Sequence, residues 1–360
     1  MKKLIIAFIV FTICVRLSAQ IPAGYYDAAA GLSGLPLKTA LYNIIKVENP
    51  ITYDQLWTAY ETTDKKLDNT VWDMYSDIPG STPPYTFTFV TDQCGTYSAE
   101  GNCYNREHSF PSSWFADADP MHTDLFHIYP TDGWVNNKRG NFPYGDVGTA
   151  TWTSLNGSKL GTCSNAGYSG TVFEPIDEYK GDFARSYFYM ATRYENLIAA
   201  WYSNATEADA ILSNNSGTVF ETWYINVLLT WNNNDTVSQK ERNRNNAVYA
   251  IQNNRNPFID HPEWIQAIWG PEAGIKTSDA SVRFNVYPIP ANDAITIISN
   301  KANDIIQKVD VYSTSSLLIH SYSKCGSKTT IDMTDYLSGI YFARIYTSNE
   351  VIQKKIIVVK

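Results

Sequence analysis

The chain has 360 residues, of which 44% are hydrophobic and 18% are charged, a composition typical of a folded globular protein. This composition excludes an intrinsically disordered chain, a collagen and a pure coiled coil. The formal net charge of −8 is unevenly distributed: residues 20–280 carry 16 Lys and Arg against 30 Asp and Glu, whereas residues 281–360 carry 9 against 6. Because Lys and Arg drive polyanion binding, the acidic part does not have the charge expected of a polyanion binder, and a nucleic-acid substrate would require the help of a bound cation.

Residues 1–19 follow the pattern of a secretory signal peptide. Lys2 and Lys3 precede an apolar run from Leu4 to Val15, and Ala19 offers a small residue for cleavage. The run is shorter than the roughly 20 apolar residues that a membrane-spanning helix needs. We therefore expect export and no transmembrane segment in the mature chain.

The cysteine pattern agrees with an oxidising compartment. Cys94 and Cys103 bracket a short loop that contains Gly95 and Gly101, which predicts a disulfide bond. Cys163 and Cys325 fall in different predicted domains, so we expect them to be free or separately paired rather than joined.

Helical spacing of apolar residues predicts helices over 37–45, 52–60, 182–202 and 218–231. A capping box of Thr52 and Gln55 opens the helix over 52–60. A basic-polar helix around Lys240 follows the helix over 218–231. Alternation of aromatic residues with Thr predicts a strand over residues 85–90. From Phe284 onward the chain consists of about seven short β-rich runs, which predicts a small β-sandwich. The expected division is a signal peptide (1–19), a catalytic domain (20–280) and a β-sandwich (281–360).

Three polar segments concentrate the residues that can do chemistry. They are Cys103-Tyr-Asn-Arg-Glu-His-Ser-Phe-Pro111, Thr123-Asp-Leu-Phe-His-Ile-Tyr-Pro130 and Thr131-Asp-Gly-Trp-Val-Asn-Asn-Lys-Arg-Gly-Asn141. In the third segment Asp132 can cap a short helix that Gly140 ends. The predicted local order is therefore a strand with His108, a second strand and a short helix with Asn136.

This arrangement suits hydrolysis of a phosphodiester bond, which needs a base for water and a cation for the developing charge. His108 titrates near neutrality and fits the base. Glu107 and Asn136 offer oxygen ligands for Mg²⁺, which takes only one or two protein groups. Adjacent strand residues point to opposite faces, so we expect the backbone to leave strand geometry at Glu107 and His108. Pro111 biases Phe110 and withholds a backbone donor, which favours an end of the strand at His108.

The three motifs resemble those of the bacterial endonuclease I family, secreted or periplasmic nucleases of the His-Me finger (ββα-metal) type. The resemblance continues in Gly181–Met190 and Asn254–Asp260. It implies an α+β, helix-rich domain in which His108 is the general base and Glu107 and Asn136 bind one divalent cation, Mg²⁺, Mn²⁺ or Ca²⁺. It also implies cleavage of DNA, and often RNA, with little sequence preference.

The chain departs from the family pattern at one point. Some members carry an Arg that touches the scissile phosphate, on an insert after the His motif, and this chain has no Arg between Glu107 and Asp124. Arg139 is a candidate substitute, and its other interpretation is a solvated helix end. Further candidates are Arg106, Arg242 and Arg244.

The C-terminal residues resemble a second family, the type A sorting domain of the type IX secretion system. The resemblance rests on Val286–Asp293, Leu337–Ala343 and Lys354–Lys360. It implies a small Ig-like sandwich that export machinery recognises and a secreted or surface-exposed protein.

Two alternatives remain at this stage. A zinc site of His122 and His127 is disfavoured, because residues five apart share neither a helix face nor a strand face; His127 and Asp124 are expected to support the structure. The competing class of function is a surface-displayed adhesin or glycan-binding module without catalysis. We favour a monomeric, secreted, metal-dependent endonuclease acting on DNA and possibly on RNA.

Overall fold

The computed structural model describes residues 21–270, 284–299, 305–313, 318–347 and 351–360. The chain divides into a unit that ends at Gly270 and a unit that begins at Pro271. The predicted signal peptide and the residues around the predicted boundary near 280 lie outside the described residues. No helix in the described ranges is long and apolar enough to span a membrane.

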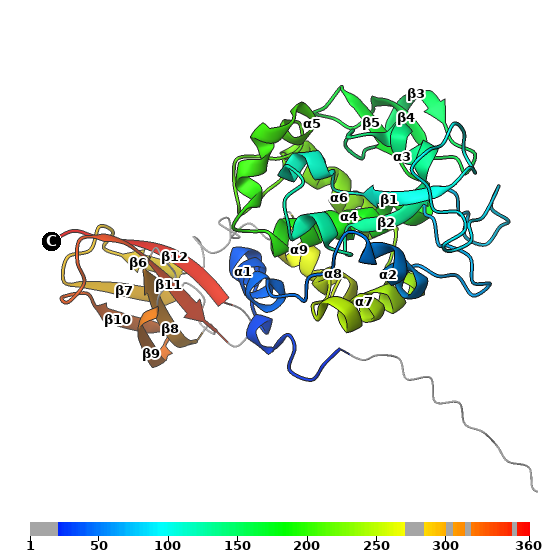
Figure 1. The fold of residues 1–360 in the computed structure, drawn as a ribbon. Helices are drawn as coiled ribbons and strands as arrows, with labels where there is room; N and C mark the ends of the chain where they lie inside the picture. Colours follow the sequence, from blue (N-terminus) through cyan, green and yellow to red (C-terminus); the bar gives the residue numbers. More distant parts are fainter. Residues whose placement is uncertain (1–20, 271–283, 300–304, 314–317, 348–350) are drawn as a thin grey trace, which may run out of the picture. The chain divides into compact units, whose positions relative to one another are not determined.

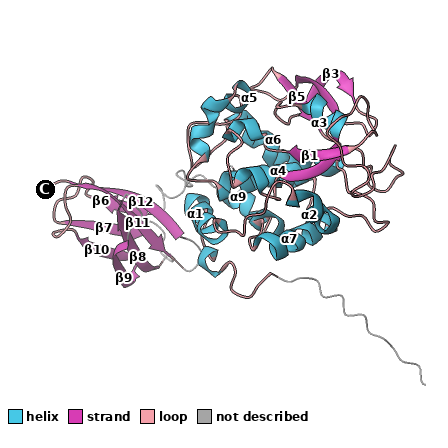
Figure 2. Cartoon of the chain, viewed as in Figure 1, coloured by secondary structure: helices cyan, strands magenta, loops and turns pink. Residues whose placement is uncertain are grey.

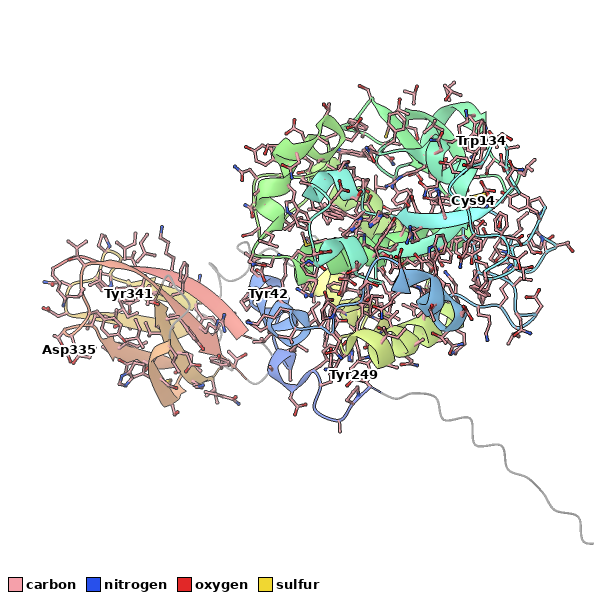
Figure 3. All side chains as sticks on the ribbon, in the orientation of Figure 1. Tyr42, Cys94, Trp134, Tyr249, Asp335 and Tyr341 are labelled. Carbon is pink, nitrogen blue, oxygen red and sulfur yellow. A yellow bond between two sulfur atoms is a disulfide. The ribbon has the colours of Figure 1, made fainter. Side chains whose placement is uncertain are left out.

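The first unit is a mixture of helices and two small sheets (Figure 2). Its helices are α1 (Gly34–Ile45), α2 (Gln55–Thr63), α3 (Gly133–Arg139), α4 (Asp177–Arg193), α5 (Thr206–Asp209), α6 (Thr222–Asn234), α7 (Gln239–Gln252), α8 (Pro257–Asp260) and α9 (Glu263–Trp269). Helix α4 is buried along almost its whole length and contacts α1, α6 and α8. Side chains, many of them aromatic, fill the space between these elements (Figure 3).

One sheet pairs β1 (Tyr104–His108) with β2 (Ile128–Asp132) in antiparallel register. The other has the antiparallel order β3 (Val147–Thr153), β4 (Lys159–Cys163), β5 (Thr171–Glu174). Strands β1 and β2 lie side by side near α3, and α3 contacts both of them (Figure 1).

Most of the predicted helices are confirmed, but two elements differ. The stripe predicted as one helix over 182–202 forms α4, which ends at Arg193, and a separate 3-10 helix at Ile198–Asn204. The apolar pattern indicates which residues are buried, but it does not show that the helix is continuous. Ile198 and Trp201 are buried although they lie beyond the end of α4. The strand predicted over 85–90 is also wrong: only Thr88 makes a bridge, to Thr70, and Val90 has a φ of 68°.

The second unit consists of strands over its described residues, as predicted. They are β6 (Phe284–Tyr287), β7 (Ala294–Ser299), β8 (Ile306–Ser313), β9 (Leu318–Gly326), β10 (Lys328–Asp332), β11 (Gly339–Tyr346) and β12 (Val351–Val358). They form two antiparallel sheets, in the orders β10-β7-β6 and β12-β11-β8-β9. Buried aliphatic residues from both sheets form one core cluster.

The predicted disulfide between Cys94 and Cys103 is present, with the two Cα atoms 5.4 Å apart. Cys163 and Cys325 are free, and they lie in different units. The disulfide closes a loop directly before β1 and so ties residue 94 to the start of the strand that carries Glu107 and His108.

Candidate active site

Strands β1 and β2 and helix α3 form the frame of the site. Helix α3 begins where β2 ends because Asp132, which is fully buried, accepts a hydrogen bond from the Val135 amide at 2.9 Å. Its second carboxylate oxygen accepts one from the Gly101 amide at 2.7 Å, which joins the disulfide loop to the helix. Gly140, with a φ of 54°, ends the helix in a conformation that favours glycine. Both helix-end predictions are confirmed.

Two backbone hydrogen bonds, one at each end of the β1–β2 pair, show which residues of β1 bond to β2. The Gly133 amide donates to the Cys103 carbonyl at 3.0 Å, and the Ser109 amide donates to the His127 carbonyl at 2.8 Å. Odd-numbered residues of β1 therefore bond to β2, and even-numbered residues do not. Pro130, which lacks an amide hydrogen, lies opposite an even-numbered residue of β1, so the ladder loses no bond there.

Glu107 is a buried carboxylate with charged and neutral donors. Its side chain is 3% exposed, and its Oε1 accepts hydrogen bonds from Arg139 and from the Tyr75 hydroxyl, each at 2.9 Å. Burial raises the pKa of Glu107 to about 7, although Arg139 and Tyr75 favour the charged form. Both bonds from described residues end on Oε1, so Oε2 remains for another partner.

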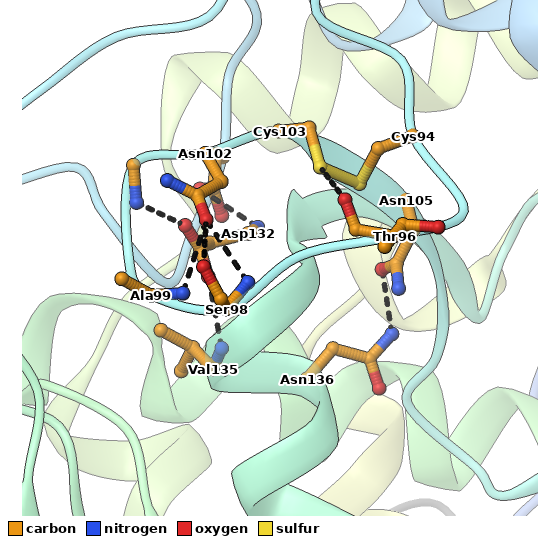
Figure 4. The surroundings of a disulfide bond; sticks show 12 residues. Cys94, Thr96, Ser98, Ala99, Asn102, Cys103, Asn105, Asp132, Val135 and Asn136 are labelled. Atoms are coloured by element: carbon orange, nitrogen blue, oxygen red, sulfur yellow. Dashed lines mark hydrogen bonds between the residues drawn. A yellow bond between two sulfur atoms is a disulfide. The ribbon is translucent and has the colours of Figure 1, made fainter.

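Asn136 lies on α3 and is opposite the face of β1 that carries Glu107. Its Nδ2 donates to Oδ1 of Asn105 at 2.8 Å, and Figure 4 shows Oδ1 of Asn136 turned away from that bond. Asn105 and Glu107 are two residues apart on β1 and therefore share a face, as Asn136 and Arg139 do on α3. The structure thus brings the two predicted cation ligands to one interface between β1 and α3.

The imidazole of His108 is oriented by a backbone carbonyl. Its Nε2 lies 3.2 Å from the carbonyl oxygen of His122. A carbonyl only accepts, so Nε2 carries the proton and Nδ1 has the lone pair that a general base needs. Burial lowers the pKa of His108 well below its usual 6.5, and the neighbouring His127 adds to this effect, so the ring is neutral at pH 7.

The structure does not place His108 and Glu107 on one face of β1. The strand ends at His108 as predicted, but His108 still pairs with Ile128, and the expected departure from strand geometry at these residues is wrong. The ring of His108 instead lies beside Tyr53 and His122, with ring centroids at 6.0 and 5.2 Å. The predicted base and the predicted cation ligands therefore approach the end of β1 from opposite sides.

Arg139 occupies neither of its two predicted environments. It is 1% exposed, so it is not a solvated helix end. Its guanidinium donates to Glu107, to the His108 carbonyl oxygen at 2.9 Å and to the Ser109 carbonyl oxygen at 2.6 Å. All three bonds lie in the protein interior. Arg139 fixes the carboxylate of Glu107 and the backbone of His108, and it offers no surface to a phosphate.

The other basic residues that the sequence singled out differ in how exposed they are. Arg244 is buried and bonds to Asp64 at 2.8 Å, and Lys240 is buried and bonds to Asp182 at 2.9 Å. Arg242 is exposed on α7, and the side chain of Arg106 is 17% exposed on the His108 face of β1.

Asp124 and His127 support the structure, as expected. Asp124 accepts hydrogen bonds from the hydroxyls of Tyr189 and Tyr194, each at 2.8 Å. His127 is fully buried, with Nε2 bonded to the Met121 carbonyl at 2.7 Å. Within the described residues, no group of three or more His, Cys, Asp and Glu could hold a metal ion, so the disfavoured zinc site gains no support.

Sequence reasoning missed two neighbours of the predicted ligands. Asn105 could have been found, because strand alternation places it beside Glu107. Tyr75, which lies 32 residues before Glu107, carried no local signal. A carboxylate oxygen and an amide oxygen at one interface match the hard oxygen ligands of Mg²⁺, so the donor set fits a divalent cation.

Residues 33–263 match the family described as Endonuclease I, and residues 285–359 match the secretion system C-terminal sorting domain. The extracellular ribonuclease of Bacillus amyloliquefaciens is 36% identical over 251 residues, which cover 68% of this chain and 78% of that protein. The extracellular ribonuclease of Bacillus subtilis (strain 168) is 33% identical over 253 residues, with the same two coverages. Endonuclease-1 of Buchnera aphidicola subsp. Baizongia pistaciae is 31% identical over 140 residues, 39% of this chain and 46% of that protein. The chain therefore belongs to the endonuclease I family, and it is a secreted or surface-located nuclease with a type IX sorting domain.

Proposed function

We propose that this nuclease is a divalent-metal-dependent, sequence-nonspecific endonuclease of the His-Me finger type, which hydrolyses phosphodiester bonds in both DNA and RNA. The order β1, β2, α3 supports this type, because it presents a histidine on the first strand and an asparagine on the helix. The names of the Bacillus relatives support RNA as a substrate, and the name of the Buchnera relative supports an endonuclease.

One observation carries the proposal: the hydrogen bond from Nε2 of His108 to the His122 carbonyl leaves Nδ1 unprotonated. A neutral imidazole held in one orientation can take a proton from water as the water attacks phosphorus. The low pKa of His108 keeps the base ready at neutral pH.

Glu107 and Asn136 are the residues that would hold the cation, through Oε2 and Oδ1. A divalent cation bound there would supply positive charge at the phosphate and would stabilise the departing 3′ oxygen. Cleavage on that side of the phosphate would leave 5′-phosphate ends. Arg139 and Tyr75 orient Glu107, and Asn105 orients Asn136. Because β1 ends at His108, a phosphate that lies across this end is accessible from both faces of the strand.

The remaining organisation is proposed on the same basis. Residues 1–19 are the signal peptide, 20–280 the catalytic domain and 281–360 an Ig-like sandwich that the type IX machinery recognises. The two antiparallel sheets of the second unit support the sandwich. We propose that the mature protein acts as a monomer.

The test is a cleavage assay with purified protein, supercoiled plasmid and structured RNA, in Mg²⁺ or in excess chelator. We expect nicking and linearisation of the plasmid and degradation of the RNA with Mg²⁺ only. The variant His108→Ala should lose at least ~10² in rate, which is the usual contribution of a general base.

The control variant is Arg242→Gln, because Arg242 is exposed on α7 and, among the contacts of the described residues, makes none with Glu107, His108 or Asn136. It should cut at the wild-type rate. Cleavage in chelator would contradict metal dependence, and wild-type cleavage by His108→Ala would reject the assigned base. An intact plasmid and intact RNA with Mg²⁺ would favour a binding module without catalysis.

A further inference from the structure

Several arginines of the first unit are not available to contact a polyanion. Arg139, Arg185 and Arg244 are each buried against a carboxylate, with side chains no more than 5% exposed. These groups are neutralised inside the protein and cannot reach a substrate. The acidic surface of the unit therefore makes any basic side chain near His108 important for holding nucleic acid.

Arg106 is such a side chain. It is two residues before His108 on β1 and therefore lies on the same face, about 6.7 Å along the strand. Its Nη1 donates to the carbonyl oxygen of Tyr53 at 2.9 Å. Its guanidinium carbon lies 3.6 Å from the ring centroid of Tyr53 and 4.5 Å from that of Trp57.

The aromatic contacts connect Arg106 to the base. The ring of Tyr53 stacks on those of His108 and His122, with interplanar angles of 16° and 14°. Tyr53 therefore contacts the guanidinium and also packs near the ring of the candidate base. Cation–π contacts with two rings hold the guanidinium in place before the substrate arrives, which lowers the entropy cost of binding.

The guanidinium is suited to a phosphate. It is planar, permanently charged and able to donate two parallel hydrogen bonds to phosphate oxygens. Unlike the buried arginines, the side chain of Arg106 is 17% exposed.

We propose that Arg106, clamped by Tyr53 and Trp57, binds a backbone phosphate of the nucleic acid next to the bond that is cut at His108. This inference rests on the proposed function of the site. The sequence analysis named several arginines as candidates for the phosphate contact, and the proposal assigns this contact to Arg106.

Asp54 gives the proposal an independent test. Its carboxylate lies 3.6 Å from Arg106, and its side chain is 96% exposed. An exposed ion pair of this kind is weak, so a phosphate can displace the carboxylate. Asp54 then competes with the substrate for Arg106, and removing its charge should strengthen binding.

The experiment measures binding rather than cleavage. The full chain carrying His108→Ala is titrated in EDTA into a fluorescein-labelled single-stranded oligonucleotide, and the dissociation constant is measured by anisotropy at several salt concentrations. Adding Arg106→Gln should weaken binding on the order of tenfold. It should also reduce the slope of log K against log salt by about 0.7, the value for one lost phosphate contact with a single strand.

The matched control is Arg242→Gln, which removes the same charge from an exposed site on α7. It should change the dissociation constant less than twofold. Arg106→Lys should restore most of the salt slope, because lysine keeps the charge, but only part of the affinity.

Two further measurements locate the contact. Replacing one phosphate of an end-labelled oligonucleotide by a neutral methylphosphonate should lower cleavage with Mg²⁺ at the adjacent bonds, as read from product lengths with His108 intact, and this penalty should vanish in Arg106→Gln. Asp54→Asn should tighten binding in the Arg106 protein and have no effect in Arg106→Gln. Because Asp54 is exposed, this second arm decides the question even when Arg106→Gln lowers the melting temperature.

The proposal is overturned when Arg106→Gln keeps the salt slope of its parent, when every methylphosphonate penalty persists in it, or when Asp54→Asn acts equally in both backgrounds. These outcomes differ from a failure of the proposed function. In that case the wild-type chain does not cut with Mg²⁺, whatever the binding data show.

Discussion

Replacing Arg139 with methionine removes the positive charge that neutralises Glu107 in the protein interior. The two side chains are 1% and 3% exposed and 2.9 Å apart. Breaking a buried pair from one side costs about 3–5 kcal/mol, because the remaining carboxylate must either stay charged without compensation or take up a proton. The carbonyl oxygens of His108 and Ser109 also lose donors, so we expect a loss of about 4 kcal/mol or more.

The assay is thermal and urea unfolding of Arg139→Met in EDTA, followed by circular dichroism and tryptophan fluorescence. For a domain of this size, ~4 kcal/mol corresponds to a fall of about 8–16 °C in melting temperature. Adding Glu107→Gln should restore part of this loss, because the uncompensated carboxylate is then gone. The control Arg242→Met should stay within about 0.5 kcal/mol of wild type. A loss below ~1 kcal/mol for Arg139→Met, or simple additivity with Glu107→Gln, would refute the reasoning.

Three more predictions concern the surroundings of the site. Burial lowers the pKa of His127 from 6.5 to about 4, so between these values the folded chain binds fewer protons than the unfolded chain, and stability falls as the pH falls. Melting curves from pH 7 to pH 4 should show that this group contributes a loss of about 3 kcal/mol in the free energy of unfolding. His127→Gln should make the dependence of stability on pH less steep. Equal pH dependence in both proteins would contradict the assignment. Replacing Cys94 and Cys103 with serine opens a loop with a sequence separation of 9 and should cost roughly 2–3 kcal/mol in urea unfolding, whereas no change in midpoint would show that the loop is held by other contacts. Asp132→Ala removes the acceptor of the Val135 and Gly101 amides and should cost at least ~1–2 kcal/mol by the same measurement; a neutral effect would exclude the cap as a determinant of α3.

Local sequence signals predicted much of the frame of the site. The end of β1 at His108, the cap at Asp132 and the end of α3 near Gly140 depend on nearest neighbours, and all three are confirmed. The disulfide and the β-rich C-terminal unit are confirmed for the same reason, since close cysteines and short alternating runs are local patterns.

The environment of charged groups depends on distant parts of the chain and was not predictable. Arg139 stands at the end of a short helix, where a solvated side chain is the usual expectation, yet Tyr187 and Tyr144 enclose it. Arg244 lies on the predicted basic-polar helix around Lys240, but it bonds to Asp64, which is 180 residues away in the sequence. The relation of His108 to Glu107 depends on whether the strand pairing continues to its last residue, which the sequence alone does not decide.

The most direct test of the account is the single-turnover cleavage rate as a function of Mg²⁺ concentration for three proteins: wild type, Asn136→Ala and His108→Ala. The account assigns Asn136 to the cation and His108 to the proton. It predicts that Asn136→Ala needs a higher Mg²⁺ concentration for half-maximal rate. His108→Ala should keep the wild-type Mg²⁺ dependence at a maximal rate at least ~10² lower. A shifted Mg²⁺ dependence in His108→Ala together with an unshifted one in Asn136→Ala would contradict this division of roles.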